Sequence, residues 1–182
     1  MGLYDNKVVV VTGASSGIGE HMARRFYEEG AFVAVCSRSQ ERIERAVSAY
    51  ADGHDPRIMA VAADMTDRRA VTAFMAAVVE RFGRIDILIN NAGLSRPKST
   101  VEVLPEDFDV TVQTKFQGYF FMSQAAARDM LRRGEGGTIV QIGSVQSTTV
   151  IPGQAVYASV NAGIVQMTRS LAREWGKAGI RV

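Results

Sequence analysis

The chain has 182 residues, of which 47% are hydrophobic and 22% charged, and its net charge at pH 7 is +2. This composition is typical of one globular domain, and the small charge gives no reason to expect nucleic acid or an anionic membrane as partner. The sequence contains no apolar run long enough for a membrane span, no signal-peptide pattern at its start and only one cysteine, Cys36, so we expect a cytoplasmic protein without intrachain disulfides.

Short apolar runs alternate along the chain with segments of helical periodicity. The runs cover residues 7–14, 31–37, 57–64, 85–93 and 137–144 and are apolar on both faces, as parallel strands covered on both sides are. Ile18, Met22 and Phe26 recur at helical spacing after the first run, and similar stripes follow Ser39 and Asp67, which predict helix caps.

Further helices are expected at about residues 108–133 and from near Gln154. This alternation predicts a doubly wound α/β fold of the Rossmann type with a parallel sheet, in which residues 1–182 form one domain. No carboxylate or cysteine stands at ligand spacing from His21 or His54, so we expect no metal site.

A glycine-rich turn joins the first strand to the first helix. Gly13, Gly17 and Gly19 form a G-x-x-x-G-x-G pattern there. Such glycines permit a tight turn and a close approach of the backbone to a pyrophosphate, which the helix N-terminus attracts through its free N–H groups and dipole. The turn therefore predicts a bound dinucleotide.

Four motifs together resemble those of the short-chain dehydrogenase/reductase family. They are "TGASSGIG" from Thr12, "NNAG" from Asn90, Asp64 after the third strand, and "GSVQSTTVIPGQAVYAS" with Ser144 and Tyr157 thirteen positions apart. The resemblance implies hydride transfer between a nicotinamide and a small carbonyl or alcohol substrate. It also implies that Ser144 binds the substrate oxygen, that Tyr157 exchanges a proton with it, and that Asp64 binds the adenine.

The cofactor residues implied by the resemblance lie in the four segments at the ends of the first four strands. They are Gly13, Ser15, Ser16, Gly17, Ile18, Gly19, Ser37, Arg38, Asp64, Met65, Asn91, Ala92 and Gly93.

The end of the second strand bears on the choice between NADP and NAD. No acidic residue for a ribose 2′-hydroxyl occurs between Ala31 and Gln40, and Ser37 stands where the family's NAD-users tend to carry aspartate. Arg38 follows, and a guanidinium can bind a 2′-phosphate, although Arg38 can also be a solvated strand-end residue. Ser16 stands where many NADP-users have a basic residue, which leaves NAD as the alternative to the predicted NADP(H).

The chain departs from the family at two positions that are related. The family places a lysine four residues after the tyrosine, where it favours the tyrosinate and binds the nicotinamide ribose, but this chain has Asn161. The family also carries an asparagine where the long helix of this chain has Lys115. We hypothesise that Lys115 supplies the positive charge from the opposite helix and that Asn161 keeps the ribose contact; independent drift in a chain that no longer catalyses is the alternative.

The final residues, "AGIRV", resemble the start of a sixth strand. Members of the family usually continue with the rest of that strand, a substrate lid and a seventh strand, so we expect a partial chain. The helices at 108–133 and from Gln154 commonly form the family's subunit interface, which predicts a homodimer or homotetramer. Two functions remain open at this stage: an NADP(H)-dependent oxidoreductase and a non-catalytic dinucleotide-binding protein with a regulatory or assembly role.

Overall fold

The computed structural model describes residues 2–52 and 54–182, and within them six parallel strands form one sheet in the order β3-β2-β1-β4-β5-β6. The strands are β1 (Val8–Thr12), β2 (Phe32–Ser37), β3 (Ile58–Ala62), β4 (Ile87–Asn90), β5 (Gly137–Gln141) and β6 (Ile180–Arg181). The order reverses between β1 and β4, which is where open α/β sheets bind ligands. The predicted doubly wound parallel sheet is confirmed.

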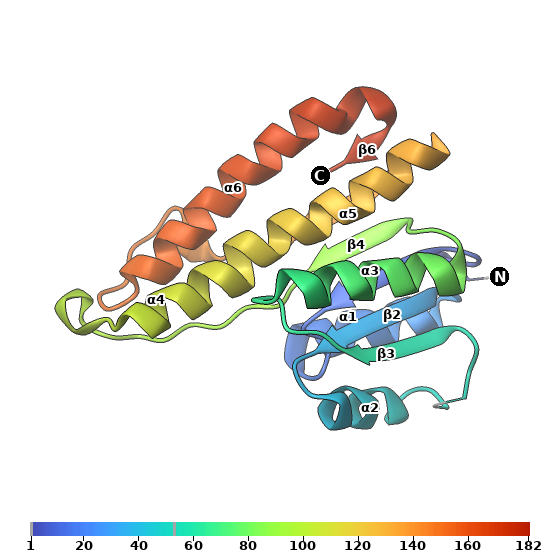
Figure 1. Cartoon of the computed structure of the whole chain (residues 1–182), viewed down its shortest axis with the longest axis horizontal. Coiled ribbons are helices and arrows are strands. Elements are labelled where there is room, and N and C mark those ends of the chain that lie inside the picture. The colour runs from blue at the N-terminus through green and yellow to red at the C-terminus, as the bar shows by residue number, and fades with distance from the viewer. Residues whose placement is uncertain (1, 53) are drawn as a thin grey trace.

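The helices cover both faces of the sheet (Figure 1). They are α1 (Gly17–Glu28), α2 (Gln40–Ser48), α3 (Arg68–Phe82), α4 (Pro105–Thr111), α5 (Gly118–Arg133) and α6 (Ala155–Trp175), with short 3-10 turns at Thr100–Glu102, Val145–Ser147 and Gly176–Ala178. The two predicted caps are confirmed: the Ser39 hydroxyl accepts from the amide of Arg42, and the Asp67 carboxylate accepts from the amide of Arg69.

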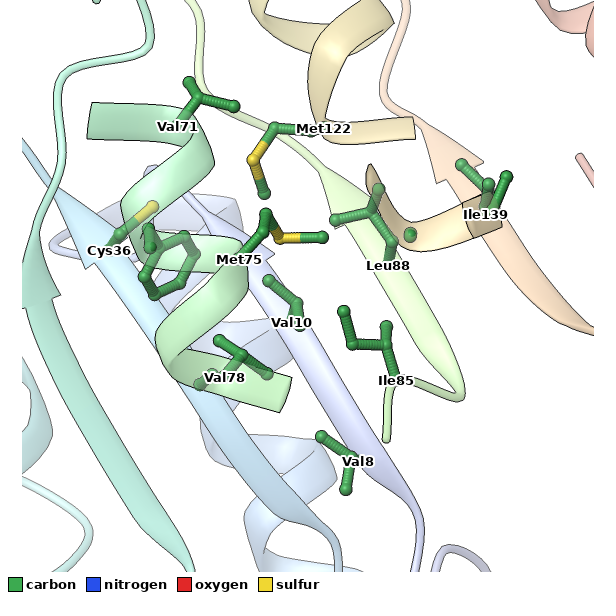
Figure 2. Packing of buried hydrophobic residues seen from close by; sticks show 14 of the residues in the cluster. Val8, Val10, Cys36, Val71, Met75, Val78, Ile85, Leu88, Met122 and Ile139 are labelled. Atoms are coloured by element: carbon green, nitrogen blue, oxygen red, sulfur yellow. The ribbon is translucent and has the colours of Figure 1, made fainter. Parts of the chain in front are cut away.

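Alternate residues of β1, β2, β3 and β4 enter two separate cores. On one face, Val8 and Val10 of β1 pack with Met75 of α3 and Leu88 of β4, as Figure 2 shows. On the other face, Val9 and Val11 pack beneath α1 and α2. All of β1 is therefore buried, which explains why its sequence is apolar without alternation.

Helix α6 lies beside α5 (Figure 1), and its buried apolar residues belong to neither of the two cores beside the sheet. Its buried residues Val160, Ile164, Met167 and Leu171 form a third cluster around Tyr119 of α5. The contact between these two helices determines which side chains of α5 face Tyr157 and Asn161.

The helix predicted at about 108–133 differs from expectation in one turn. It begins at Pro105, and between α4 and α5 it contains a π-helical segment, Val112–Gln117, that includes Lys115. Hydrogen bonds from i to i+5 accommodate an extra residue in the turn, and such turns are frequent at functional sites. The segment contains no proline or glycine that would reveal it, so periodicity alone predicts an uninterrupted α-helix.

The apolar stripe predicted for the first helix is wrong at its first member. Ile18 is 65% exposed, because it stands in the first turn of α1 and faces the ligand crevice instead of the sheet. The sixth strand is confirmed, since Gly137 and Thr138 of β5 pair with Ile180 and Arg181. No helix in the described part of the chain is long and apolar enough to cross a membrane.

Candidate active site

A cavity of about 620 Å³ opens at the carboxyl ends of β1, β2, β3 and β4. Its size suits a ligand of the dinucleotide class. All the predicted cofactor residues except Gly17 and Gly19 line it: Gly13, Ser15, Ser16, Ile18, Ser37, Arg38, Asp64, Met65, Asn91, Ala92 and Gly93. Residues from four separate strand ends thus converge on one site.

The turn before α1 has a backbone that suits a phosphate ligand. Gly13 has a φ of +65°, and a Cβ there would lie 2.8 Å from the Cα of Ala92, so only glycine fits between the two strand ends. The side chain of Ser16, the N-cap of α1, makes no capping hydrogen bond, which leaves the first-turn amides available to an anion. Gly17 and Gly19 shape this turn without lining the cavity.

Asn91 connects the end of β4 to the end of β1 and its glycine-rich turn. Its side-chain amide donates to the carbonyls of Thr12 at 3.0 Å and Gly13 at 3.2 Å, and its backbone amide donates to the Thr12 hydroxyl at 3.0 Å. The motif "NNAG" therefore holds the end of β4 against the glycine turn. Among these partners, sequence reasoning missed Thr12.

The far end of the cavity carries two arginines. Arg38 follows β2 and Arg42 lies in the first turn of α2, and both line the cavity with Ser39. Sequence reasoning missed Arg42, although the Ser39 cap places it in the first turn of the helix beyond Arg38 and so beside the same strand end. Ala63, Leu94 and Thr114 also line the wall without having been predicted.

Ser144 and Tyr157 lie outside the wall of this cavity. The Ser144 hydroxyl accepts from the amide of Gln146 at 3.2 Å and caps the turn Val145–Ser147, which packs against α6. Tyr157 is half-buried in the first turns of α6 and lines a small pocket with Arg96 and Asp107. The 3-10 turn thus connects the end of β5, where Ser144 stands, to the helix of Tyr157.

Lys115 reaches the same region from the π-helical segment. It is 3% exposed, and its Nζ donates to the carbonyl of Ile142 at 2.7 Å. The Nζ lies 5.8 Å from the ring centroid of Tyr157 and 3.6 Å from the place a Cβ on Gly93 would occupy. The ammonium therefore sits directly behind the cavity wall, between the end of β5 and the ring of Tyr157.

Asn161 does not reach the cavity. It has no exposed surface; its Nδ2 donates to the carbonyl of Tyr157 at 2.8 Å, and its Oδ1 is buried without a hydrogen-bond partner in the described residues. The ribose contact predicted for it is not preformed, because its amide is directed back along its own helix. An unpartnered buried carbonyl oxygen is costly and marks the position as one where a donor group would be stabilised.

Burial sets the ionisation of the groups around Lys115. Removal from water lowers the pKa of Lys115 to about 8, and burial together with the nearby Tyr157 raises the pKa of Tyr119 well above its usual range. At neutral pH the site therefore contains one ammonium, that of Lys115, and the neutral phenol of Tyr119. No group of His, Cys, Asp and Glu suited to a metal occurs in residues 2–52 and 54–182.

The sequence profile of the short chain dehydrogenase family matches residues 7–182. The chain belongs to this family. D-threitol dehydrogenase of Mycolicibacterium smegmatis, a relative, is 38% identical over 178 residues, which are 98% of this chain and 68% of that protein.

Two solved structures of short chain dehydrogenases contain a cofactor. The enzyme of Burkholderia cenocepacia in complex with NADP is 38% identical, has a TM-score of 0.90, and is matched over 98% of this chain and 72% of that chain. The 3-ketoacyl-(acyl-carrier-protein) reductase of Brucella melitensis complexed with NADH is 34% identical, has a TM-score of 0.91, and is matched over 98% and 74%.

These similarities decide between the two functions left open by the sequence. This short chain dehydrogenase is an NAD(P)-dependent oxidoreductase that transfers hydride to or from a small substrate, and the non-catalytic alternative is not favoured. The cavity fits the dinucleotide, since the glycine turn, the uncapped α1 N-terminus and the two arginines provide places for its phosphates.

Proposed function

We propose that this protein is an NADP(H)-preferring dehydrogenase or reductase in which Lys115 has taken over the charge that the family places four residues after the tyrosine. The observation that carries the proposal is the position of the Lys115 Nζ, buried and 5.8 Å from the ring centroid of Tyr157. Position 161 of α6 holds asparagine where the family has lysine, and the Lys115 ammonium approaches the same tyrosine from the neighbouring helix.

Each candidate residue then has a distinct role. The bound nicotinamide supplies or accepts the hydride. Tyr157 donates its phenolic proton to the substrate oxygen during reduction and takes it back during oxidation, and the Ser144 hydroxyl donates a hydrogen bond to the same oxygen. Gly93 and Thr114 form the part of the cavity wall nearest Lys115, so this is where the nicotinamide end of the dinucleotide is expected.

The distance is short enough for Lys115 to matter. A phenol is a poor base at neutral pH, and its anion needs a nearby positive charge. A unit charge 5.8 Å from the centre of the Tyr157 ring contributes about 3 kcal/mol to an anion centred there at an effective dielectric constant of about 20, enough for a rate effect of roughly a hundredfold. Because Lys115 is protonated below its pKa of about 8, this charge is present at neutral pH.

The preference for NADP rests on the arginines at the far end of the cavity. Within residues 2–52 and 54–182 neither Arg38 nor Arg42 forms an ion pair, so both guanidinium groups are available to an anion. A 2′-phosphate on the adenine ribose would face them, whereas the 2′-hydroxyl of NAD would find no acidic acceptor between Ala31 and Gln40.

We also propose a cytoplasmic homodimer or homotetramer. An apolar groove of about 570 Å³ runs between α4, the π-helical segment and α6, and Phe108, Phe116 and Val156 line it. Exposed aromatic side chains in a continuous groove are typical of a subunit interface. Sedimentation of the purified protein tests this assembly, and a monomer at micromolar concentration would contradict it.

Turnover tests the proposed activity. A panel of ketones, and of sugar and steroid alcohols, is incubated with the complete gene product and NADP(H) or NAD(H), and the nicotinamide absorbance is followed. We expect at least one substrate to turn over, faster with NADP(H). Carbonyl reduction by Lys115→Ala and Lys115→Asn is then measured as a function of pH; rates and a pH profile equal to those of the unaltered enzyme would refute the role of Lys115.

A further inference from the structure

Lys115 does not stand alone behind the cavity wall. Its Nζ lies 3.4 Å from the hydroxyl oxygen of Tyr119, one turn further along the helix, and that hydroxyl donates to the carbonyl of Ile142 at 3.2 Å. The Ile142 carbonyl also accepts from the Lys115 Nζ at 2.7 Å. The ammonium, the phenol and the carbonyl therefore form a closed triangle at the end of β5, two residues before Ser144.

A buried ammonium needs such partners. It carries three N–H groups and is 3% exposed, so each acceptor lost leaves a donor without water to replace it. The Ile142 carbonyl accepts one of these bonds and the Tyr119 oxygen accepts a second. The Tyr119 and Tyr157 rings, with centroids 5.1 and 5.8 Å from the Nζ, flank the charge from α5 and α6.

The hydroxyl of Tyr119 donates its proton away from Lys115, so its oxygen can accept a hydrogen bond from the ammonium. The hydroxyl donates to the Ile142 carbonyl, so its lone pairs face Lys115. Because burial raises the pKa of Tyr119, the phenol stays neutral across the working pH range and does not cancel the ammonium charge. The titratable groups that face Lys115 are Tyr119 and Tyr157, and no carboxylate in the described residues forms an ion pair with it.

We propose that Tyr119 is a positioning residue: its hydroxyl, held by the Ile142 carbonyl, keeps the Lys115 ammonium charged and directed toward Tyr157. This inference rests on the proposed role of Lys115 and extends it to a residue that no sequence motif marks. Tyr119 itself is 1% exposed, belongs to the α5–α6 core cluster and does not line the cofactor cavity, so it acts through Lys115 and not on the substrate.

The variant Tyr119→Phe tests the proposal, since it keeps the ring in the core and removes only the oxygen. Without the acceptor, the ammonium is less favoured and loses its proton at lower pH. We expect the upper limb of the pH profile of kcat/KM to move down by about one pH unit, and kcat/KM at pH 7.5 to fall about three- to tenfold, with the KM for cofactor within about twofold. Tyr50→Phe is the matched control, because the Tyr50 hydroxyl is also buried but has no hydrogen-bond partner among residues 2–52 and 54–182, and Tyr50 packs on the opposite face of the sheet.

A double-variant cycle with Lys115→Met separates the two claims. In that background Tyr119→Phe should change kcat/KM by less than about twofold, because the group it positions is gone. If Lys115→Met alone leaves the rate unchanged, the proposed function fails regardless of Tyr119. If Lys115→Met lowers the rate but Tyr119→Phe retains the rate and pH profile of the unaltered enzyme, or lowers the rate equally in both backgrounds, the positioning role is refuted and the role of Lys115 stands.

Discussion

The two halves of this site are built on different principles. The cofactor half, made by the loops after β1 to β4, consists mainly of backbone turns, and nearly every residue expected there lines one cavity. The catalytic half, made by residues 105–175, consists of side chains from the π-helical segment, the end of β5 and α6. There we propose that the charge comes from another helix, while Ser144 and Tyr157 keep their interval of thirteen positions.

This difference indicates what each half can tolerate. A phosphate site made of amides at a helix N-terminus is tied to the position of the backbone, so its residues cannot be exchanged between elements. A positive charge acts through distance and dielectric environment, and the same effect on Tyr157 can be supplied from either helix that faces it. The exchange of Lys115 and Asn161 is physically reasonable for that reason, whereas an exchange within the glycine turn would not be.

The largest effect is expected for a variant that removes the proposed proton donor of the catalytic half and leaves the cofactor half intact. Tyr157→Phe removes the proton donor and should lower kcat/KM by about 10² to 10⁴-fold. Cofactor affinity, measured by nicotinamide fluorescence, should stay within about twofold, because Tyr157 does not line the cavity. Substantial residual turnover, or a parallel loss of cofactor binding, would show that the halves are not separable in this way.

Restoring the family's arrangement tests whether the charge can be moved back. Lys115→Asn alone should lower kcat/KM by about 10- to 100-fold, and the double variant Lys115→Asn with Asn161→Lys should recover most of that loss. Asn161→Lys alone places two ammonium groups near Tyr157 and serves as the control. A double variant no more active than Lys115→Asn would mean that the two positions are not exchangeable.

Substitution of the two arginines that line the cavity tests the cofactor half. Arg38→Ala and Arg42→Ala should each raise the KM for NADPH about tenfold while changing the KM for NADH less than about threefold, as expected for loss of one charge-assisted bond to a 2′-phosphate. Arg45→Ala, on the same helix but paired with Glu41, is the matched control and should change neither KM. Equal effects on both cofactors would refute the proposed role in NADP preference.

The smallest expected effect is on stability: Lys115→Met should stabilise the folded protein even though it lowers activity. The pKa of Lys115 is lowered from 10.5 to about 8, so below pH 8 the folded protein carries an ammonium that the unfolded chain accommodates better. Lys115→Met should therefore raise the free energy of unfolding by about 1 to 3 kcal/mol at pH 7, or the melting temperature by about 2–12 °C.

The pH dependence provides the check on this prediction. Between pH 8 and 10.5 the unfolded chain binds more protons at this lysine than the folded protein, so the stability of the unaltered protein rises with pH and the gain from Lys115→Met shrinks. Melting curves at pH 7 and pH 10 measure this. A gain that is absent at pH 7, or that grows with pH, would contradict the assignment.

Much of the molecule follows from the sequence itself. The apolar runs predict parallel strands because residues such as Val8 to Val11 are buried on both faces, and Gly13 predicts the phosphate turn because no other residue fits against Ala92. The caps at Ser39 and Asp67 are equally local, since each side chain bonds an amide two or three residues away. The strands, the cofactor turn and the helix starts depend on short stretches of chain, and such stretches can be interpreted without coordinates.

The tertiary structure decided the rest, because it depends on distances between elements remote in sequence. The π-helical turn, the burial of Lys115 against the Ile142 carbonyl, its contact with Tyr119 and its distance to Tyr157 arise where α5, β5 and α6 meet. In the same region Asn161 is fully buried, with its amide directed to the carbonyl of Tyr157 and away from the cavity. Sequence spacing names the residues of a site; only packing determines which of them share a charge or a hydrogen bond.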